Sequence, residues 1–147
     1  MSAPAVLGTA NQIIAANPKQ SVWVSANAGT GKTRVLVDRI SRLLLAGTAP
    51  GRILCLTFTK AAAAEMANRL SARLSLWSAI DHHTLVIDLQ GLLNRTPSDV
   101  EMSRAQMLFA ETLDASETLN ARTVYSFCES LLGRFPLEAG LAPQFTV

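Results

Sequence analysis

The chain has 147 residues, of which 49% are hydrophobic and 16% charged, so it is long enough for one domain with a single core. Its formal net charge of +2 is too small to indicate a nucleic-acid partner by charge alone. No apolar run approaches the ~20 residues of a membrane-spanning helix, and the N-terminus lacks the basic-then-apolar layout of a signal peptide.

The two cysteines, Cys55 and Cys128, both stand among apolar residues. We expect them to be buried, reduced thiols, which is typical of a cytoplasmic protein without a membrane partner. The apolar, strand-like ending at 144–147 predicts that the chain is a piece of a longer protein.

In the first half of the chain, predicted helices and strands alternate: a helix over 9–16 with Thr9 as N-cap, a strand over 21–25, a helix over 32–45, a strand over 52–57 and a helix over 60–77. Both strands are nearly continuous in apolar character, which predicts burial on two faces in a parallel sheet. Two such strands joined through one helix form a right-handed βαβ unit, so the predicted class is α/β.

Helical periodicity predicts the inward faces of the first two long helices. In the helix over 32–45 the stripe consists of Leu36, Val37, Ile40, Leu43 and Leu44. In the helix over 60–77 it consists of Ala63, Met66, Ala67, Leu70 and Leu74. Asp38 with Arg42, and Glu65 with Arg69, are spaced as i,i+4 pairs on the outer faces. Trp23 and Trp77 are expected to pack in the interior.

The second half predicts helices over 85–93 and 100–113, a strand over 120–124 and a helix over 125–135. We interpret about 81–117 as a helical insertion between strands. The inward residues of the helix over 100–113 are predicted to be Met102, Ala105, Phe109 and Leu113, and those of the last helix Phe127, Cys128, Leu131, Leu132 and Phe135.

One glycine-rich stretch carries the most specific chemistry. It follows the predicted strand over 21–25, opens the helix that follows, and consists of Ala26, Asn27, Ala28, Gly29, Thr30, Gly31, Lys32 and Thr33. A strand, a glycine-rich turn, Gly-Lys-Thr and a helix together predict a phosphate-binding loop. Ala26 departs from the usual pattern, which has glycine there.

The predicted roles follow from the residue types. Gly29 and Gly31 permit the tight backbone path that points N–H groups at a polyphosphate, and the following helix directs its positive end to the same anion. Lys32 is predicted to reach the β- and γ-phosphates of ATP, and the Thr33 hydroxyl to bind Mg²⁺.

Three separated stretches resemble the early motifs of the UvrD/Rep-type superfamily 1 DNA helicases. Residues 26–37 are similar to motif I, residues 56–66 closely resemble motif Ia, and residues 121–128 resemble motif Ib. Within the family, residues 135–140 and 143–145 look most like those of AddA-type helicase-nuclease subunits. The resemblance implies a P-loop NTPase, RecA-like parallel sheet with flanking helices, present here as the N-terminal part (1–147) of the first RecA-like domain.

The resemblance also implies further site residues. Gln12 stands in the place of the glutamine that reads adenine, since one amide offers both a donor and an acceptor, and Arg34 is a candidate second contact to the base. Single-stranded DNA is expected to contact Phe58, Thr59, Lys60, Thr123, Tyr125 and Ser126. For Phe58 the alternative is core packing, and for Thr123 and Ser126 it is capping of a helix.

In the full-length protein, this family would couple ATP hydrolysis to translocation on DNA, act on DNA ends in double-strand break repair, and pair with an AddB-like partner. The acids of the Walker B motif, the second RecA-like domain and the nuclease domain have no counterpart in these residues, so we expect the isolated segment to hydrolyse ATP poorly.

Two alternatives stay open from the sequence. One is a small self-contained P-loop kinase or NTPase that uses Asp88, at the end of the apolar run 85–88, as its metal-binding acid. We favour Asp88 as a polar residue on an exposed helix face, because Leu89 rather than Glu follows it. The other alternative is a non-enzymatic nucleotide- or DNA-binding module with a degenerate loop.

Overall fold

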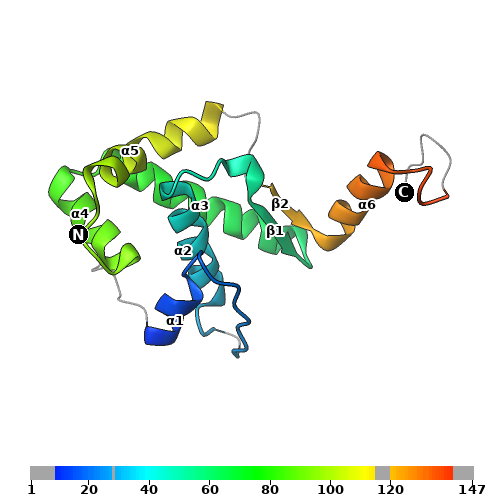
Figure 1. Ribbon diagram of the computed structural model, residues 1–147, viewed down its shortest axis with the longest axis horizontal. Coiled ribbons are helices and arrows are strands. Elements are labelled where there is room, and N and C mark those ends of the chain that lie inside the picture. Colours follow the sequence, from blue (N-terminus) through cyan, green and yellow to red (C-terminus); the bar gives the residue numbers. More distant parts are fainter. Residues whose placement is uncertain (1–8, 28, 115–119, 141–147) are drawn as a thin grey trace.

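The computed structural model describes residues 9–27, 29–114 and 120–140, and the side chains of these residues except at 113 and 114. Its elements in chain order are α1 (Ala10–Ala15), α2 (Lys32–Leu45), the 3-10 helix η1 (Pro50–Arg52), β1 (Leu54–Thr57), α3 (Lys60–Ala79), α4 (His82–Leu93), α5 (Asp99–Asp114), β2 (Asn120–Thr123) and α6 (Val124–Arg134) (Figure 1). None of the described helices has the length and apolar character needed to cross a membrane.

The sheet consists of two parallel strands. Leu54 is opposite Asn120 and Thr57 is opposite Thr123, so β1 and β2 end at the same level. The chain passes from one to the other through α3, α4 and α5, as a parallel pair requires a long crossover. The predicted α/β class is therefore confirmed.

One hydrophobic core joins the sheet to helices α2, α3, α4 and α5. Its fully buried side chains come from all four helices and include Leu44, Trp77, Leu85, Leu89 and Leu108. The helices of the expected insertion thus share the core of α2 and α3 rather than forming a separate one. In Figure 1 these helices gather around α3, while α6 extends away from them on the far side of the sheet.

The prediction of a buried strand over 21–25 is wrong. This segment pairs with no described strand, and Trp23 is 94% exposed, with Val22 and Val24 also exposed. A strand gains its burial from neighbours on both sides, and the described residues provide none here. Of the two tryptophans, only Trp77 packs in the core as expected.

The second strand is shorter than expected, and one of its faces is open. Cys55 is buried, as expected, and burial raises the pKa of its thiol. Leu54 and Leu56 point to the other face and are exposed. The prediction of burial on both faces is therefore wrong for β1, because the described helices cover only the face that carries Cys55.

The inward stripe of α2 includes Val37, Ile40 and Leu44 as predicted, but Leu36 is exposed. The predicted pair of Asp38 with Arg42 is also wrong. Asp38 instead accepts a bond of 2.6 Å from Arg73 on α3, which ties the two helices together. Arg42 turns toward main-chain carbonyl oxygens.

The stripe of α3 is confirmed at Ala63, Met66, Leu70 and Leu74, and its Glu65–Arg69 pair forms at 2.6 Å. In α5, Met102 and Ala105 are buried as predicted and Phe109 packs against the core, whereas the side chain of Leu113 lies outside the described part.

Helix α6 has no buried residue among those described, and Cys128 is exposed, so the predicted inward face is wrong. An apolar stripe becomes buried only where another element covers it, and α6 contacts only the strands.

Candidate functional site

The glycine-rich loop has the backbone that a phosphate cradle needs. Gly29 and Gly31 have φ values of 79° and 86°, in the left-handed region that favours glycine. Asn94 is the one described non-glycine residue with positive φ, so Ala26 needs no glycine conformation. This explains how alanine fits where the pattern has glycine. Ala28 lies outside the described residues.

Helix α2 begins directly at the loop. Its N-cap is Gly31, which supplies no side-chain hydrogen bond, so the first N–H groups of α2 are left for another acceptor. An uncapped helix start with its positive dipole end is a site for an anion. The Thr30 hydroxyl holds the turn by donating to the Asn27 carbonyl oxygen at 2.8 Å.

The Lys32 ammonium lies across the loop. It donates to the carbonyl oxygens of Ala26 and Asn27 at 2.8 and 2.6 Å. Thr33 follows in the first turn of α2, and Arg34 lies one residue further, 3.8 Å from the Asp38 carboxylate. A cationic head within a ring of main-chain groups, with a hydroxyl beside it, fits the polyphosphate and metal of Mg·ATP.

Helix α1 brings Gln12 to the same place. The Gln12 Nε2 atom donates to the Thr30 carbonyl oxygen at 3.2 Å, while Oε1 accepts from the Thr9 N–H at 2.9 Å. Thr9 caps α1 as predicted, and the two residues form a capping box. A side-chain amide has two donors and two acceptor positions, so one of each remains after these bonds. That remaining pair is what the edge of adenine requires.

A pocket of about 470 Å³ lies between α1 and the loop. Gln12, Trp23, Thr30 and Lys32 are among its lining residues. The structure thus brings together the predicted base-reading residue and the predicted phosphate-binding residues, although 20 residues of sequence separate Gln12 from Lys32.

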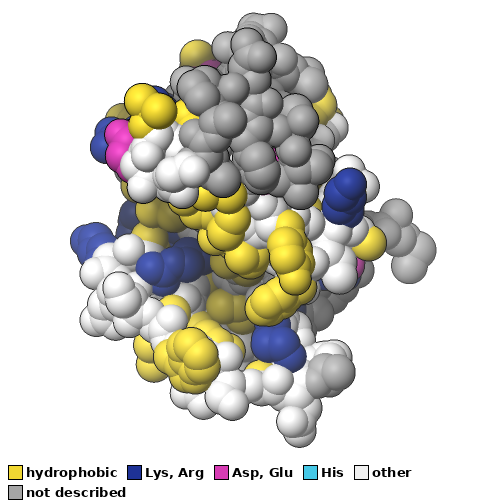
Figure 2. All heavy atoms as spheres, turned by 90° about the vertical axis from the view of Figure 1, so that its right-hand side faces the viewer, with side chains coloured by type: hydrophobic (Ala, Val, Ile, Leu, Met, Phe, Trp, Pro, Cys, Tyr) yellow, Lys and Arg dark blue, Asp and Glu magenta, His cyan; other side chains and the backbone are white. Residues whose placement is uncertain are grey.

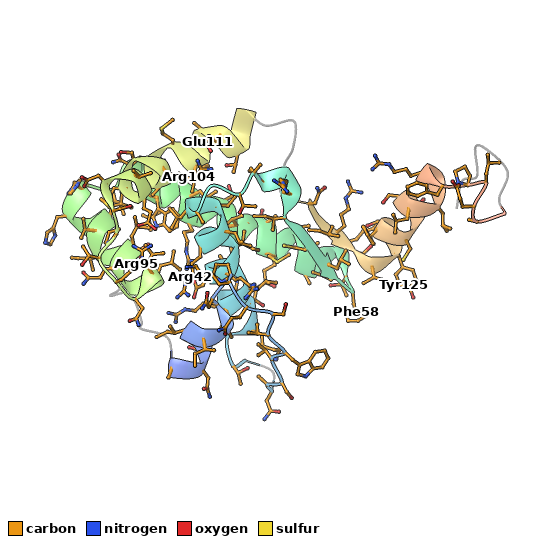
Figure 3. All side chains as sticks on the ribbon, viewed as in Figure 1. Arg42, Phe58, Arg95, Arg104, Glu111 and Tyr125 are labelled. Carbon is orange, nitrogen blue, oxygen red and sulfur yellow. The ribbon has the colours of Figure 1, made fainter. Side chains whose placement is uncertain are left out.

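The predicted DNA contacts meet at the carboxyl edge of the sheet. Because Thr57 and Thr123 are paired, the residues that follow β1 and β2 emerge side by side. Phe58 is 86% exposed and Tyr125 is 81% exposed, which rejects core packing for Phe58. Figure 3 places both rings on the same side of the molecule, beside the ends of the strands.

The hydroxyls at this edge also cap helices. Thr59 accepts from the Ala62 N–H and begins α3, and Thr123 accepts from the Ser126 N–H and begins α6, both at 3.1 Å. Thr123 is only 8% exposed. The capping alternative is therefore confirmed for Thr123, and Ser126 completes the turn by donating to the Thr123 carbonyl oxygen.

A second pocket, of about 350 Å³, lies between α3, β2 and α6. Its polar lining comes from Lys60, Arg122, Thr123 and Ser126, so residues of motifs Ia and Ib share one hollow. In Figure 2, hydrophobic side chains spread over the middle of the face turned to the viewer, with Lys and Arg side chains around them. A mixture of aromatic, apolar and cationic groups is suited to stacked bases and a phosphate backbone.

Asp88 takes no part in either pocket. It lies in the middle of α4 and accepts a hydrogen bond of 2.6 Å from the Trp77 indole. An acid that binds the metal of a nucleotide would follow a strand beside the phosphate loop, so this position does not support the kinase alternative.

Comparison with known families decides between the readings of these motifs. The model of the UvrD/REP helicase N-terminal domain matches residues 7–147. This chain belongs to that family. The UvrD/REP match extends over both pockets and over the segment that joins them.

Curated relatives named as the A subunit of an ATP-dependent helicase/nuclease are similar to most of the chain. The protein from Lactobacillus johnsonii is 35% identical over 128 residues, which is 87% of this chain and 9% of the relative. Those from Lactiplantibacillus plantarum and Desulforudis audaxviator are 30% and 31% identical over 91% and 88% of this chain, and 10% and 9% of their own length. The chain thus spans about a tenth of the length of these relatives.

Two residues of this UvrD/REP domain that sequence reasoning did not single out are Arg39 and Arg42 on α2. Arg39 donates to main-chain carbonyls between 15 and 20, and Arg42 to those of Ile13 and Leu92. Burial lowers the pKa of Arg42, and the nearby Asp38 charge opposes that shift. The signal available in the sequence was an arginine within a helix that is otherwise turned toward the core.

Proposed function

We propose that this chain is the ATP-binding N-terminal part of an ATP-dependent DNA helicase of the AddA type, with a RecA-like P-loop fold. In the intact protein, ATP and Mg²⁺ would bind at the loop 26–33, and single-stranded DNA at the edge formed by 58–60 and 123–126. The nuclease activity, the role in double-strand break repair on DNA ends and an AddB-like partner belong to the same proposal and rest on the relatives' names.

One observation carries the nucleotide role. Gly29 and Gly31 adopt positive φ directly before a helix start that no side chain caps, and Lys32 lies over the same turn. The main-chain N–H groups and the ammonium would bind the phosphates, Thr33 would hold the metal, and Gln12 and Arg34 would contact the base. Bound Mg²⁺ supplies charge neutralisation between the β- and γ-phosphates.

The mechanical role follows from how the two pockets are connected. Helix α2 begins at the nucleotide loop, α3 begins at the DNA edge, and the two helices are tied by the Asp38–Arg73 ion pair and a shared core. A displacement of the loop on nucleotide binding would therefore be transmitted to Phe58, Thr59 and Lys60 through packed helices.

The first test is the variant Lys32→Ala in the intact protein. Loss of the ammonium should abolish ATP hydrolysis, lowering the rate at least about 100-fold, because one charged group at a transferring phosphoryl is worth that much. Lys19→Ala, which removes a lysine before the predicted strand, is the matched control and should keep the parent rate. Undiminished turnover by Lys32→Ala would reject the proposed nucleotide site.

A further inference from the structure

Helix α1 is too small to hold its own position. It has six residues, and its only buried side chain is Ala15. An isolated helix of this length is unstable in water, so its orientation must come from contacts with other elements. The position of α1 matters, since it determines where the Gln12 amide lies relative to the phosphate loop.

Arg39 supplies such contacts. One of its terminal nitrogens donates to the carbonyl oxygens of Ala15 and Asn17 at 3.3 and 2.5 Å, and the other donates to that of Gln20 at 2.7 Å. The first two acceptors lie at the C-terminal end of α1, where carbonyls have no partner within the helix. The third lies just before the segment that leads into the loop. One guanidinium thus fastens both ends of the connection between α1 and the segment that precedes the phosphate loop.

Arg42, one turn further along α2, adds a longer bridge. It donates to the Ile13 carbonyl oxygen of α1 at 3.4 Å and to the Leu92 carbonyl oxygen of α4 at 2.9 and 2.5 Å (Figure 3). Its shorter bonds are those to α4, so Arg39 is the principal tie to α1.

We propose that Arg39 is a positioning residue for base selection: it holds α1 so that the Gln12 amide presents its remaining donor and acceptor to adenine. This rests on the proposed function, because Gln12 must contact the base. The planar fork of arginine is required, since a lysine ammonium cannot span carbonyls at the end of α1 and at Gln20 together.

The test is nucleotide binding to the intact protein, with ATP, GTP and inorganic triphosphate as three separate ligands. Gln12→Ala and Arg39→Lys should each reduce the preference for ATP over GTP about 10-fold, while the affinity for inorganic triphosphate stays at the parent value. Arg69→Lys, on the outer face of α3, is the matched control and should keep the preference.

The double variant Gln12→Ala/Arg39→Lys separates positioning from general stability. If Arg39 acts through Gln12, the double variant should lose no more preference than Gln12→Ala alone. Equal weakening of all three ligands by Arg39→Lys, or a preference loss that adds fully to that of Gln12→Ala, would overturn the inference. Failure of the parent protein to bind ATP at all would instead reject the proposed function.

Discussion

Single backbone angles explain which loop positions need glycine. Gly31 has a φ of 86°, and a Cβ built there would lie 3.4 Å from Gln12 Nε2. Ala26 has no positive φ. The loop therefore depends on glycine at 29 and 31 and accepts alanine at 26, which a pattern of sequence letters does not distinguish.

These angles predict unequal effects of two reciprocal substitutions. Gly31→Ala should weaken ATP binding about 10-fold, because a non-glycine residue in the left-handed region costs about 1–2 kcal/mol and here would also displace the Gln12 amide. Ala26→Gly should change the affinity less than about twofold. Calorimetric titration of each variant with Mg·ATP measures both, and equal losses would contradict this account of the loop.

Glu101 is the residue whose charge depends most on the fold. Arg95 binds both of its carboxylate oxygens, and Ser98 donates to it from both its N–H and its hydroxyl. The Arg95 bonds, with the help of Ser98, lower the pKa of Glu101 from 4.5 to about 2, against a smaller opposing effect of burial.

A lowered carboxyl pKa stabilises the fold above its unfolded value and loses that effect on acidification. The stabilisation by Glu101 should be complete above pH 4.5 and should disappear as the pH falls to about 2. Glu101→Gln should lower the free energy of unfolding by about 1 kcal/mol at pH 7, allowing for solvent screening. Urea unfolding as a function of pH measures this, with the exposed Glu65→Gln as control; a difference that persists unchanged at pH 2 would contradict it.

At the scale of elements, helices were predictable from the sequence and strand partners were not. The caps at Thr9, Thr59 and Thr123 and the 3.6-residue period are local signals, and α2 was predicted with its observed bounds. The exposed segment 21–25 and the uncovered α6 have the same apolar patterns as buried elements. Their exposure depends on which distant segments cover them, and local pattern carries no information on that.

The hydrogen bond between Trp77 and Asp88 links α3 to α4 and tests the rejected kinase alternative. Asp88→Ala should lower the free energy of unfolding by about 1–3 kcal/mol, because the indole N–H of a fully buried tryptophan loses its acceptor. The affinity for Mg·ATP should stay unchanged. Thermal unfolding and nucleotide titration of the same sample give both values; a folded variant that no longer binds ATP would restore Asp88 as a metal-binding acid.

At the scale of the whole molecule, two pockets share one framework. The nucleotide pocket lies at the start of α2 and the DNA edge at the start of α3, and these helices are packed in one core. The sequence predicted the residues of both sites through their motifs. It did not predict the arginine ties of α1, because their acceptors are main-chain carbonyls, which leave no trace in side-chain patterns.

The most direct test of the central claim is the rate of ATP hydrolysis by the intact protein with and without single-stranded DNA. The parent should be stimulated at least about 10-fold. The variant Phe58→Ala/Lys60→Gln, which leaves the Thr59 cap in place, should keep its DNA-independent rate and lose the stimulation. A hydrolysis rate that DNA does not change, or stimulation that survives in this variant, would contradict the account of a nucleotide loop coupled to a DNA edge.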